Sequence, residues 1–490
     1  MNYIEALKKE DILLTTTENG DTAFSSSGSF CLDFYALAGG MRYNYIGINN
    51  LFIRSYFENK LLTIKVMLYL RDILNGLGER NSFRMTFNLL ANLNPKLAKQ
   101  LLPLIPKYGR WDDVLAGLNT PIEDDVIKLI EVTLEEDIEN YEKGKEISLI
   151  SKWLPSINTS NQEARLMAKR IADKLGYTPE EYRKILSKLR KGKIVENYLR
   201  VKDYSFDYSK VPSQALLKYT RSFMKKDQDK FRSYLRSVAS GRYRINLSTL
   251  STSQVTSLRR KNISEDEKFE EEFQNLVWTM LERNEFKTKA IIVRDGSGSM
   301  EWGPGSLKPS EIATSLAIFA AEQLPHPFKN HFITFSENPR LIKIPEGTLK
   351  EKLAYIDTFD EAANTNISKV YDLLLNVARK EEVKQEDMVE QVIIISDMQF
   401  DRCVKGETTF NTYKNKFEKL GLKMPQLVFW NVAARNIQVP VTENELGVKL
   451  VSGSSQKILD NVISNKINQT PYEFMLESLE RYSEVDNFEI

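Results

Sequence analysis

Residues 291–300 read IIVRDGSGSM and carry three oxygen-bearing side chains at alternate positions, Asp295, Ser297 and Ser299. The apolar run IIV predicts a β-strand, and the glycines predict a tight turn directly after it. One carboxylate and two hydroxyl groups are hard oxygen ligands, which suit a small divalent cation. They are too few to enclose the ion, so water or an outside ligand would complete its coordination. The motif therefore predicts divalent-cation-dependent binding rather than a closed structural metal site.

A second chemical feature is the basic segment, which we define as residues 183–260. It holds 20 Lys or Arg and 5 Asp or Glu, a net charge of +15 in a chain whose overall charge is +1. Aromatic residues are interleaved with these cations. Cations that neutralise phosphates and rings that stack on unpaired bases are the combination that single-stranded or irregular RNA selects. Alternatively, the rings form helix core and the cations a solvated face, because SQALLKYTRSFMKK spaces its apolar residues as a helix does.

The composition describes a globular protein with ample core, since 42% of its 490 residues are hydrophobic and 28% are charged. No apolar stretch approaches the length of a membrane span, and the start, MNYIEALKKEDILLTT, lacks the pattern of a secretion signal. Cys31 and Cys403 are the only cysteines, so neither a disulfide scaffold nor a thiolate zinc site is expected. We expect a cytoplasmic monomer that does not bind membranes.

Two hydrophobic patterns divide the chain near residue 285. Up to about residue 280, apolar residues recur at helical spacing in segments separated by Gly and Pro, which predicts a HEAT-like array of helix pairs. After it, strand-like runs alternate with helical stretches, which predicts a doubly wound α/β domain. The strand-like runs are KAIIVRD, HFITFS, RLIKI, QVIIIS, QLVFWNV and VKLVSG. We expect an α-helical repeat domain over 1–284, an α/β domain over 285–465 and a C-terminal helix over 466–490.

The second half of the chain resembles a von Willebrand factor A domain with a metal-ion-dependent adhesion site, over residues 288–455. In that family a Thr from a second loop and an Asp after a later strand join the DxSxS loop. Thr365, in NTNISKVYDLLL, and Asp397, in VIIISDMQFD, match these elements. Ala363-Asn364 departs from the family, where a Gly pair is common.

The resemblance implies how a cation is held. Ser297, Ser299 and Thr365 would contact Mg²⁺ directly, while Asp295 and Asp397 would act mostly through water. Another divalent cation, Mn²⁺ or Ca²⁺, would suit the same oxygen donors.

The first half contains TTTENGDTAFSSSGSFCLDFYALAGGMR, LYLRDILNGLGERNSFR and YGRWDDVL, which resemble landmarks of TROVE-type helical modules. Such modules occur in Ro autoantigen proteins and in a related, poorly characterised family with the same two-part organisation. The resemblance implies a ring of helical repeats that the A domain closes and that binds small structured or single-stranded RNA. The candidate RNA-binding residues are cations of the basic segment: Arg190, Lys191, Lys193, Arg221, Lys225, Lys226, Arg232, Arg236, Arg242 and Arg244.

We interpret the chain first as a Ro-like RNA-binding protein, in which the A domain closes the ring or binds a partner. The alternative is a cation-dependent module that captures an acidic group of a partner protein and has no RNA function. An assembly component, indifferent to metal and RNA, is a third possibility. Enzymatic activity is not expected, because His326 and His331 are the only histidines and neither has the setting of a general acid or base.

Overall fold

The computed structural model describes residues 14–19, 22–191, 194–260, 266–303, 305–336, 338–359, 366–399, 409–463 and 469–490. These residues form two compact units. Unit 1 comprises residues 1–82 and 247–483, and unit 2 comprises residues 83–246 and 484–490. Unit 1 contains a six-stranded mixed sheet, and unit 2 is built of helices.

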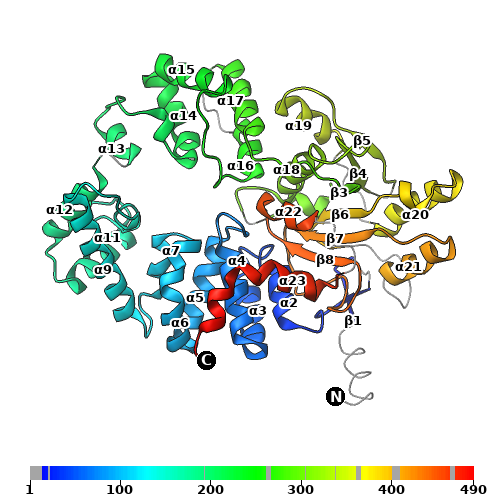
Figure 1. Cartoon of the computed structure of the whole chain (residues 1–490), viewed down its shortest axis with the longest axis horizontal. Coiled ribbons are helices and arrows are strands. Elements are labelled where there is room, and N and C mark those ends of the chain that lie inside the picture. The colour runs from blue at the N-terminus through cyan, green and yellow to red at the C-terminus, as the bar shows by residue number, and fades with distance from the viewer. Residues whose placement is uncertain are drawn as a thin grey trace. The chain divides into compact units, whose positions relative to one another are not determined.

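The sheet of unit 1 has the strand order β5-β4-β3-β6-β7-β8 (Figure 1). Neighbouring strands are parallel except β4 and β5, which pair antiparallel at one edge. Every residue of β3, β6, β7 and β8 is buried, as expected of strands covered on both faces. The strands are β3 Ala290–Asp295, β4 His331–Phe335, β5 Leu341–Lys343, β6 Gln391–Ser396, β7 Gln426–Asn431 and β8 Val448–Ser452. All six predicted strands are confirmed.

The helices between the strands also lie where the pattern predicts them. They are α18 Pro309–Ala321, α19 Leu349–Asp357, α20 Ile367–Lys380 and α21 Thr409–Lys419. Helix α18 is buried along almost its whole surface, because it packs on β3 and β6 with one side and on α16 (Thr252–Thr256) with another. A helix that is apolar all round can only be stable in such a position.

Unit 1 combines residues 1–82 with residues 247–483, so the units do not follow the predicted division at residue 285. Helix α2 (Phe30–Leu37) is almost entirely buried and packs against β8 and α23 (Pro471–Leu479). The Tyr35 hydroxyl donates to Ser478 Oγ at 3.0 Å. In Figure 1 α2 and α23 accordingly lie side by side. The burial of α2 against β8 and α23 thus assigns the start of the chain to unit 1, which the order of the segments in the sequence does not reveal.

The other elements of unit 1 flank the sheet. They are β1 Leu14–Thr16, β2 Thr22–Phe24, α3 Tyr45–Glu58, α4 Lys60–Arg71, η4 Ser257–Arg260, α17 Glu267–Thr279, η5 Gly298–Glu301, η6 Gln385–Asp387, η7 Gln456–Ile458 and α22 Leu459–Val462. The predicted C-terminal helix is shorter than 466–490, since α23 gives way to the 3-10 segment η8, Glu480–Asn487.

Apart from residues 484–490, unit 2 consists of helices from the first half of the chain. They are α5 Arg80–Leu93, α6 Pro95–Leu101, η1 Leu102–Leu104, α7 Ile105–Tyr108, α8 Trp111–Val114, η2 Leu115–Gly117, α9 Glu123–Glu142, α10 Ile150–Trp153, α11 Gln162–Lys174, α12 Pro179–Arg190, α13 Val195–Arg200, η3 Tyr208–Lys210, α14 Ser213–Lys226 and α15 Gln228–Ala239. Helix content confirms the helical prediction, whereas the HEAT-like and ring arrangements stay predictions. Every helix in the described part of the chain is too short or too polar to traverse a lipid bilayer.

Charged residues near the start of unit 2 are used for packing. Asp113 is buried and accepts hydrogen bonds from Arg84 Nε at 2.6 Å and from the Arg110 backbone N–H at 2.9 Å. The Arg110 guanidinium lies 3.9 Å from the centre of the Trp153 ring, a cation–π contact. These residues of the YGRWDDVL landmark therefore hold helices together.

Candidate functional site

Four of the five predicted metal ligands meet at one edge of the sheet. Because β3 and β6 are parallel neighbours, with Arg294 opposite Ile395, the loops that follow them leave the sheet at the same edge. The Ser297 backbone N–H donates to Asp295 Oδ1 at 2.9 Å, and Ser297 Oγ lies 3.0 Å from Ser299 Oγ. Asp397 lies close enough to raise the pKa of Asp295 and to interact with Ser299. Thr365, the fifth, lies outside the described residues.

The two carboxyl groups are buried with little positive charge to balance them. Asp295 is fully buried and Asp397 is 1% exposed. Burial, and secondarily the charge of Asp397, raise the pKa of Asp295 to about 7. Burial also raises the pKa of Asp397, although Ser299, the Gln399 backbone N–H and Arg435 favour its charged form. The site thus disfavours two negative charges unless a cation joins them.

One atom of this site has no partner suited to a carboxylate. Asp397 Oδ1 accepts from the Gln399 backbone N–H at 3.2 Å, but the buried Oδ2 atom makes no hydrogen bond. Arg435 Nε lies 3.7 Å from Oδ2, which permits electrostatic attraction but is too long for a hydrogen bond. Since an unsatisfied buried oxygen is costly, Oδ2 marks where a bound cation or its water would be accommodated. Two carboxylates and two hydroxyls fit Mg²⁺ or another hard divalent cation.

Three further residues shape the site and were not predicted from the sequence. Ser396 Oγ donates to Asp295 Oδ2 at 2.5 Å, and it also accepts from the Met398 backbone N–H. Met398 itself has a φ of 63°, a left-handed conformation that costs a non-glycine residue about 1–2 kcal/mol. Arg435 donates from Nη2 to the Ser299 carbonyl oxygen. Ser396 could have been found from its place beside Asp397, whereas nothing in the sequence connects Arg435 with the DxSxS loop.

The raised pKa of Asp295 gives the metal-free protein a characteristic dependence on pH. The pKa is about 7 in the folded chain and near 3.8 for an ordinary Asp, so in this window the folded state keeps a proton that the unfolded state has lost. The proton on Asp295 therefore contributes fully to the free energy of unfolding below the lower pKa, 3.8. This contribution is lost as the pH rises from there to about 7, at about 1.4 kcal/mol per pH unit. Asp295→Asn should lack this part of the pH dependence.

Urea unfolding of both proteins in EDTA, between pH 4 and pH 8, measures the difference. The free energy of unfolding of the variant should rise relative to that of the wild type as the pH increases. Parallel pH profiles for the two proteins would contradict the raised pKa.

The aromatic residues of the basic segment form a core of their own in unit 2. The Tyr208 ring lies 5.1 Å from Phe223, 5.0 Å from Phe231 and 5.7 Å from Tyr234, measured between ring centres. These four side chains are at most 8% exposed. The alternative in which the rings are helix core is thus correct for them, whereas Tyr243 is 49% exposed.

The ten candidate RNA-binding cations do not form one class. Lys193 lies outside the described residues, and Arg190 and Arg232 are half-buried. The Arg232 Nε atom is fully buried, which makes this residue a poor phosphate contact. The others are exposed: Lys191, Arg221, Lys225, Lys226, Arg236, Arg242 and Arg244. Within the part of the chain that the structure describes, no side-chain hydrogen bond or ion pair engages these seven.

Arg190 joins α12 to α10 and to the segment that follows α10. Its guanidinium donates to the carbonyl oxygens of Ser151 at 2.6 Å and Leu154 at 2.8 Å, and to Ser156 Oγ at 2.6 Å. Burial lowers its pKa. The geometry thus assigns Arg190 to packing within unit 2.

Arg190→Ala should lower the free energy of unfolding by about 2–3 kcal/mol, because two backbone carbonyls lose a charged donor. Arg190→Lys should restore little, since an ammonium group cannot reach three acceptors as a planar guanidinium does. Chemical denaturation checks both values, with Lys191→Ala at the exposed neighbour as the control. Equal stability of the Arg190 and Lys191 variants would show that the Arg190 contacts contribute nothing.

The comparisons with known proteins agree with a two-part chain. Residues 17–129 and 122–285 match a family described as "Domain of unknown function (DUF2828)", and residues 289–487 match "Domain of unknown function (DUF7788)". The chain is 29% identical to "Uncharacterized protein L728" of Acanthamoeba polyphaga mimivirus over 512 residues, which covers 96% of this chain and 88% of the viral protein.

Among solved structures, the Ro (RSR) protein of Deinococcus radiodurans aligns with 93% of this chain and 100% of its own. The sequence identity is 12% and the TM-score 0.43. These values are too low to assign a fold or a function, so the Ro-type ring stays a prediction from sequence.

Proposed function

We propose that this chain, which belongs to the DUF2828 family, binds a divalent cation at the carboxyl ends of β3 and β6 and thereby captures an acidic group of a partner. The observation that supports it is the buried pair Asp295 and Asp397, in which Asp397 Oδ2 has no hydrogen-bond partner. Together with Ser297 and Ser299, these side chains would hold the ion. Bound Mg²⁺ would supply the balancing charge and an open position for an outside carboxylate.

A binding role suits this site better than catalysis. His331 begins β4, so it lies at the opposite edge of the sheet from the loops that follow β3 and β6, and His326 precedes it in the chain. The described site consists of oxygen donors whose pKa shifts follow from burial and mutual repulsion. Such donors hold a cation, whereas proton transfer would need a positioned acid or base within reach of a substrate.

The direct test is a calorimetric titration of the full chain with Mn²⁺, followed by binding of a labelled peptide with a single Asp. One metal site per chain is expected, and peptide binding should require the metal and be lost when Asn replaces the peptide's Asp. Failure of the chain to bind Mn²⁺ or Mg²⁺ would overturn the proposal.

RNA binding by unit 2 is a second candidate function, and a different observation favours it. Seven exposed cations of the basic segment lack an ion-pair partner among the described residues, and Arg221 and Lys225 lie one turn apart on α14. Unpaired cations on adjoining helices attract a polyanion. Because Tyr208, Phe223, Phe231 and Tyr234 are buried, we expect contacts to phosphates rather than base stacking to supply most of the affinity, which should then depend strongly on salt.

A further inference from the structure

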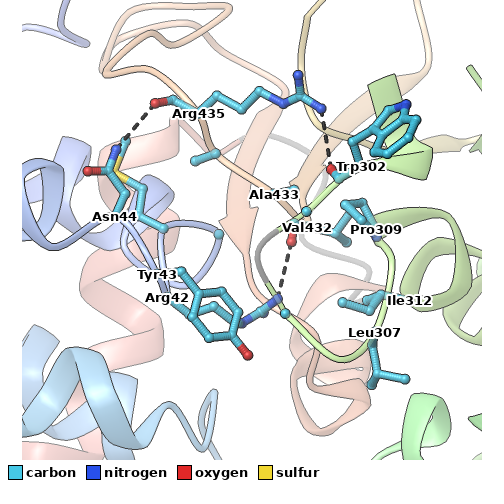
Figure 2. A pocket seen from close by; sticks show the side chains of 15 residues that line it. Arg42, Tyr43, Asn44, Trp302, Leu307, Pro309, Ile312, Val432, Ala433 and Arg435 are labelled. Atoms are coloured by element: carbon cyan, nitrogen blue, oxygen red, sulfur yellow. Dashed lines mark hydrogen bonds between the residues drawn. The ribbon is translucent and has the colours of Figure 1, made fainter. Parts of the chain in front are cut away.

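A pocket of about 210 Å³ opens beside the candidate metal site, within unit 1. Figure 2 shows its walls: residues 40–44 on one side, Trp302, Leu307 and Pro309 on another, and residues 432–435 between them. Pockets that enclose a whole small-molecule ligand measure about 300–1,000 Å³. This pocket therefore has room for one side chain or a similar group.

The inner surface of the pocket is apolar. Met41, Leu307, Pro309, Ile312, Val432 and Ala433 line it. Its polar residues are engaged elsewhere: Arg42 forms an ion pair with Glu79 at 2.8 Å, and Asn44 Nδ2 donates to the Arg435 carbonyl oxygen at 3.3 Å. An apolar group that enters the pocket would thus gain burial without breaking polar contacts.

Close backbone contacts build the pocket into unit 1. The Ala434 backbone N–H donates to the Gly40 carbonyl oxygen at 3.1 Å. A Cβ atom on Gly40 would lie 2.6 Å from Ala434 N, and one on Gly305 would lie 2.8 Å from the Tyr43 ring. Glycine is needed at position 40, because the atom that a Cβ would meet there belongs to the backbone. Residues 40–44 precede the α/β part of the sequence by more than 240 positions, so only the fold supplies this wall.

Arg435 connects the pocket to the candidate metal site. It lines the pocket, and its Nη2 atom donates to the Trp302 carbonyl oxygen (Figure 2). The same Nη2 atom donates to the Ser299 carbonyl oxygen, and the Nε atom lies 3.7 Å from Asp397 Oδ2. Trp302 is 77% exposed at the rim of the pocket. It directly follows η5, which contains the candidate metal ligand Ser299. A partner that places a carboxylate at the metal would therefore also lie close to the positive charge of Arg435 and to the apolar pocket that Arg435 lines.

We propose that this pocket receives an apolar side chain adjacent to the captured acidic residue, so that the partner is a peptide segment in which Asp or Glu neighbours a residue such as Leu. The inference rests on the proposed function and adds a sequence preference to it. The charge of Arg435 and of the bound cation selects the carboxylate, and the apolar pocket selects its neighbour.

Fluorescence anisotropy with labelled tetrapeptides on the full chain tests the preference. The probes are Gly-Leu-Asp-Gly, Gly-Asp-Leu-Gly, Gly-Gly-Asp-Gly and Gly-Leu-Asn-Gly amides, each in Mg²⁺ and in EDTA. At least one Leu-Asp order should bind about tenfold more tightly than Gly-Gly-Asp-Gly, because one apolar side chain becomes buried. Binding of the Asn probe should be lost.

Ala433→Trp fills the pocket from its half-exposed wall, and Ala433→Ser is the matched control. The Trp variant should lose the Leu preference while its Mn²⁺ titration stays unchanged. If that variant fails to fold, Leu307→Ala, which removes part of the wall, should lower the preference severalfold.

The outcomes separate the two proposals. Metal-dependent binding of all Asp probes with equal affinity would overturn the pocket assignment and leave cation-dependent capture intact. A Leu preference that persists in Ala433→Trp would also overturn it. Absence of metal binding would overturn both, and Leu-dependent binding that survives EDTA and the Asn replacement would show that the pocket does not act with the metal.

Discussion

Asp397→Asn is expected to abolish divalent-cation binding and, at pH 8 without metal, to make the protein more stable than the wild type. The two changes have one cause. Asp397 Oδ2 is a buried carboxylate oxygen without a hydrogen bond, a condition that costs about 1–3 kcal/mol. Neutralising it also removes the second-largest cause of the raised pKa of Asp295, whose ionisation then costs less.

In the wild type, the metal should reverse this order of stability. A ligand at 100 times its Kd stabilises a folded protein by about 2.7 kcal/mol, so Mg²⁺ should raise the unfolding midpoint of the wild type and leave that of Asp397→Asn unchanged. Differential scanning calorimetry in EDTA and in Mg²⁺ measures both effects. Asp387→Asn, at an exposed carboxylate of η6, is the control and should behave as the wild type. Equal stabilisation of Asp397→Asn by Mg²⁺ would exclude this residue from the site.

Reversing Arg221, Lys225 and Lys226 to Glu is expected to reduce RNA affinity by at least about a hundredfold at low salt, if unit 2 binds RNA. These side chains are exposed on α14. Arg232, another candidate from the sequence, is left out of this variant because its Nε atom is buried. Each lost phosphate contact should lower the slope of log affinity against log salt by about 0.7–0.9. The slope should therefore become less steep by about 2–3, measured by filter binding or anisotropy with single-stranded and hairpin RNA.

A charge-matched control separates a local contact from the overall charge. Lys343, Lys380 and Lys419 are exposed lysines of the α/β part, and their reversal changes the net charge of the chain equally. The control should bind RNA nearly as the wild type does. Equal losses in both triple variants would indicate non-specific attraction, and unchanged binding by the Arg221 triple variant would remove unit 2 from consideration.

The candidate metal site shows how much can be inferred from local sequence patterns. The DxSxS spacing identified Asp295, Ser297 and Ser299, and the place of Asp397 after a buried strand brought it to the same sheet edge, because neighbouring parallel strands end together. The basic segment was harder to interpret. Tyr208, Phe223, Phe231 and Tyr234 have the composition of a stacking surface, but their contacts with one another make them core. Composition cannot distinguish these roles, since a ring is equally suited to both.

The sequence by itself determined the strands and helices of the α/β part, because hydrophobic periodicity is a local property, and it singled out four oxygen-bearing side chains, Asp295, Ser297, Ser299 and Asp397, that the fold brings together. Only the tertiary structure decided which distant segments complete the site. Arg435, in the segment that follows β7, lies near Asp397. Residues 40–44 form a wall of the pocket because α2, which precedes them, is too apolar to remain exposed and is buried against β8. That burial is a property of the whole core, so no spacing along the chain could have revealed it.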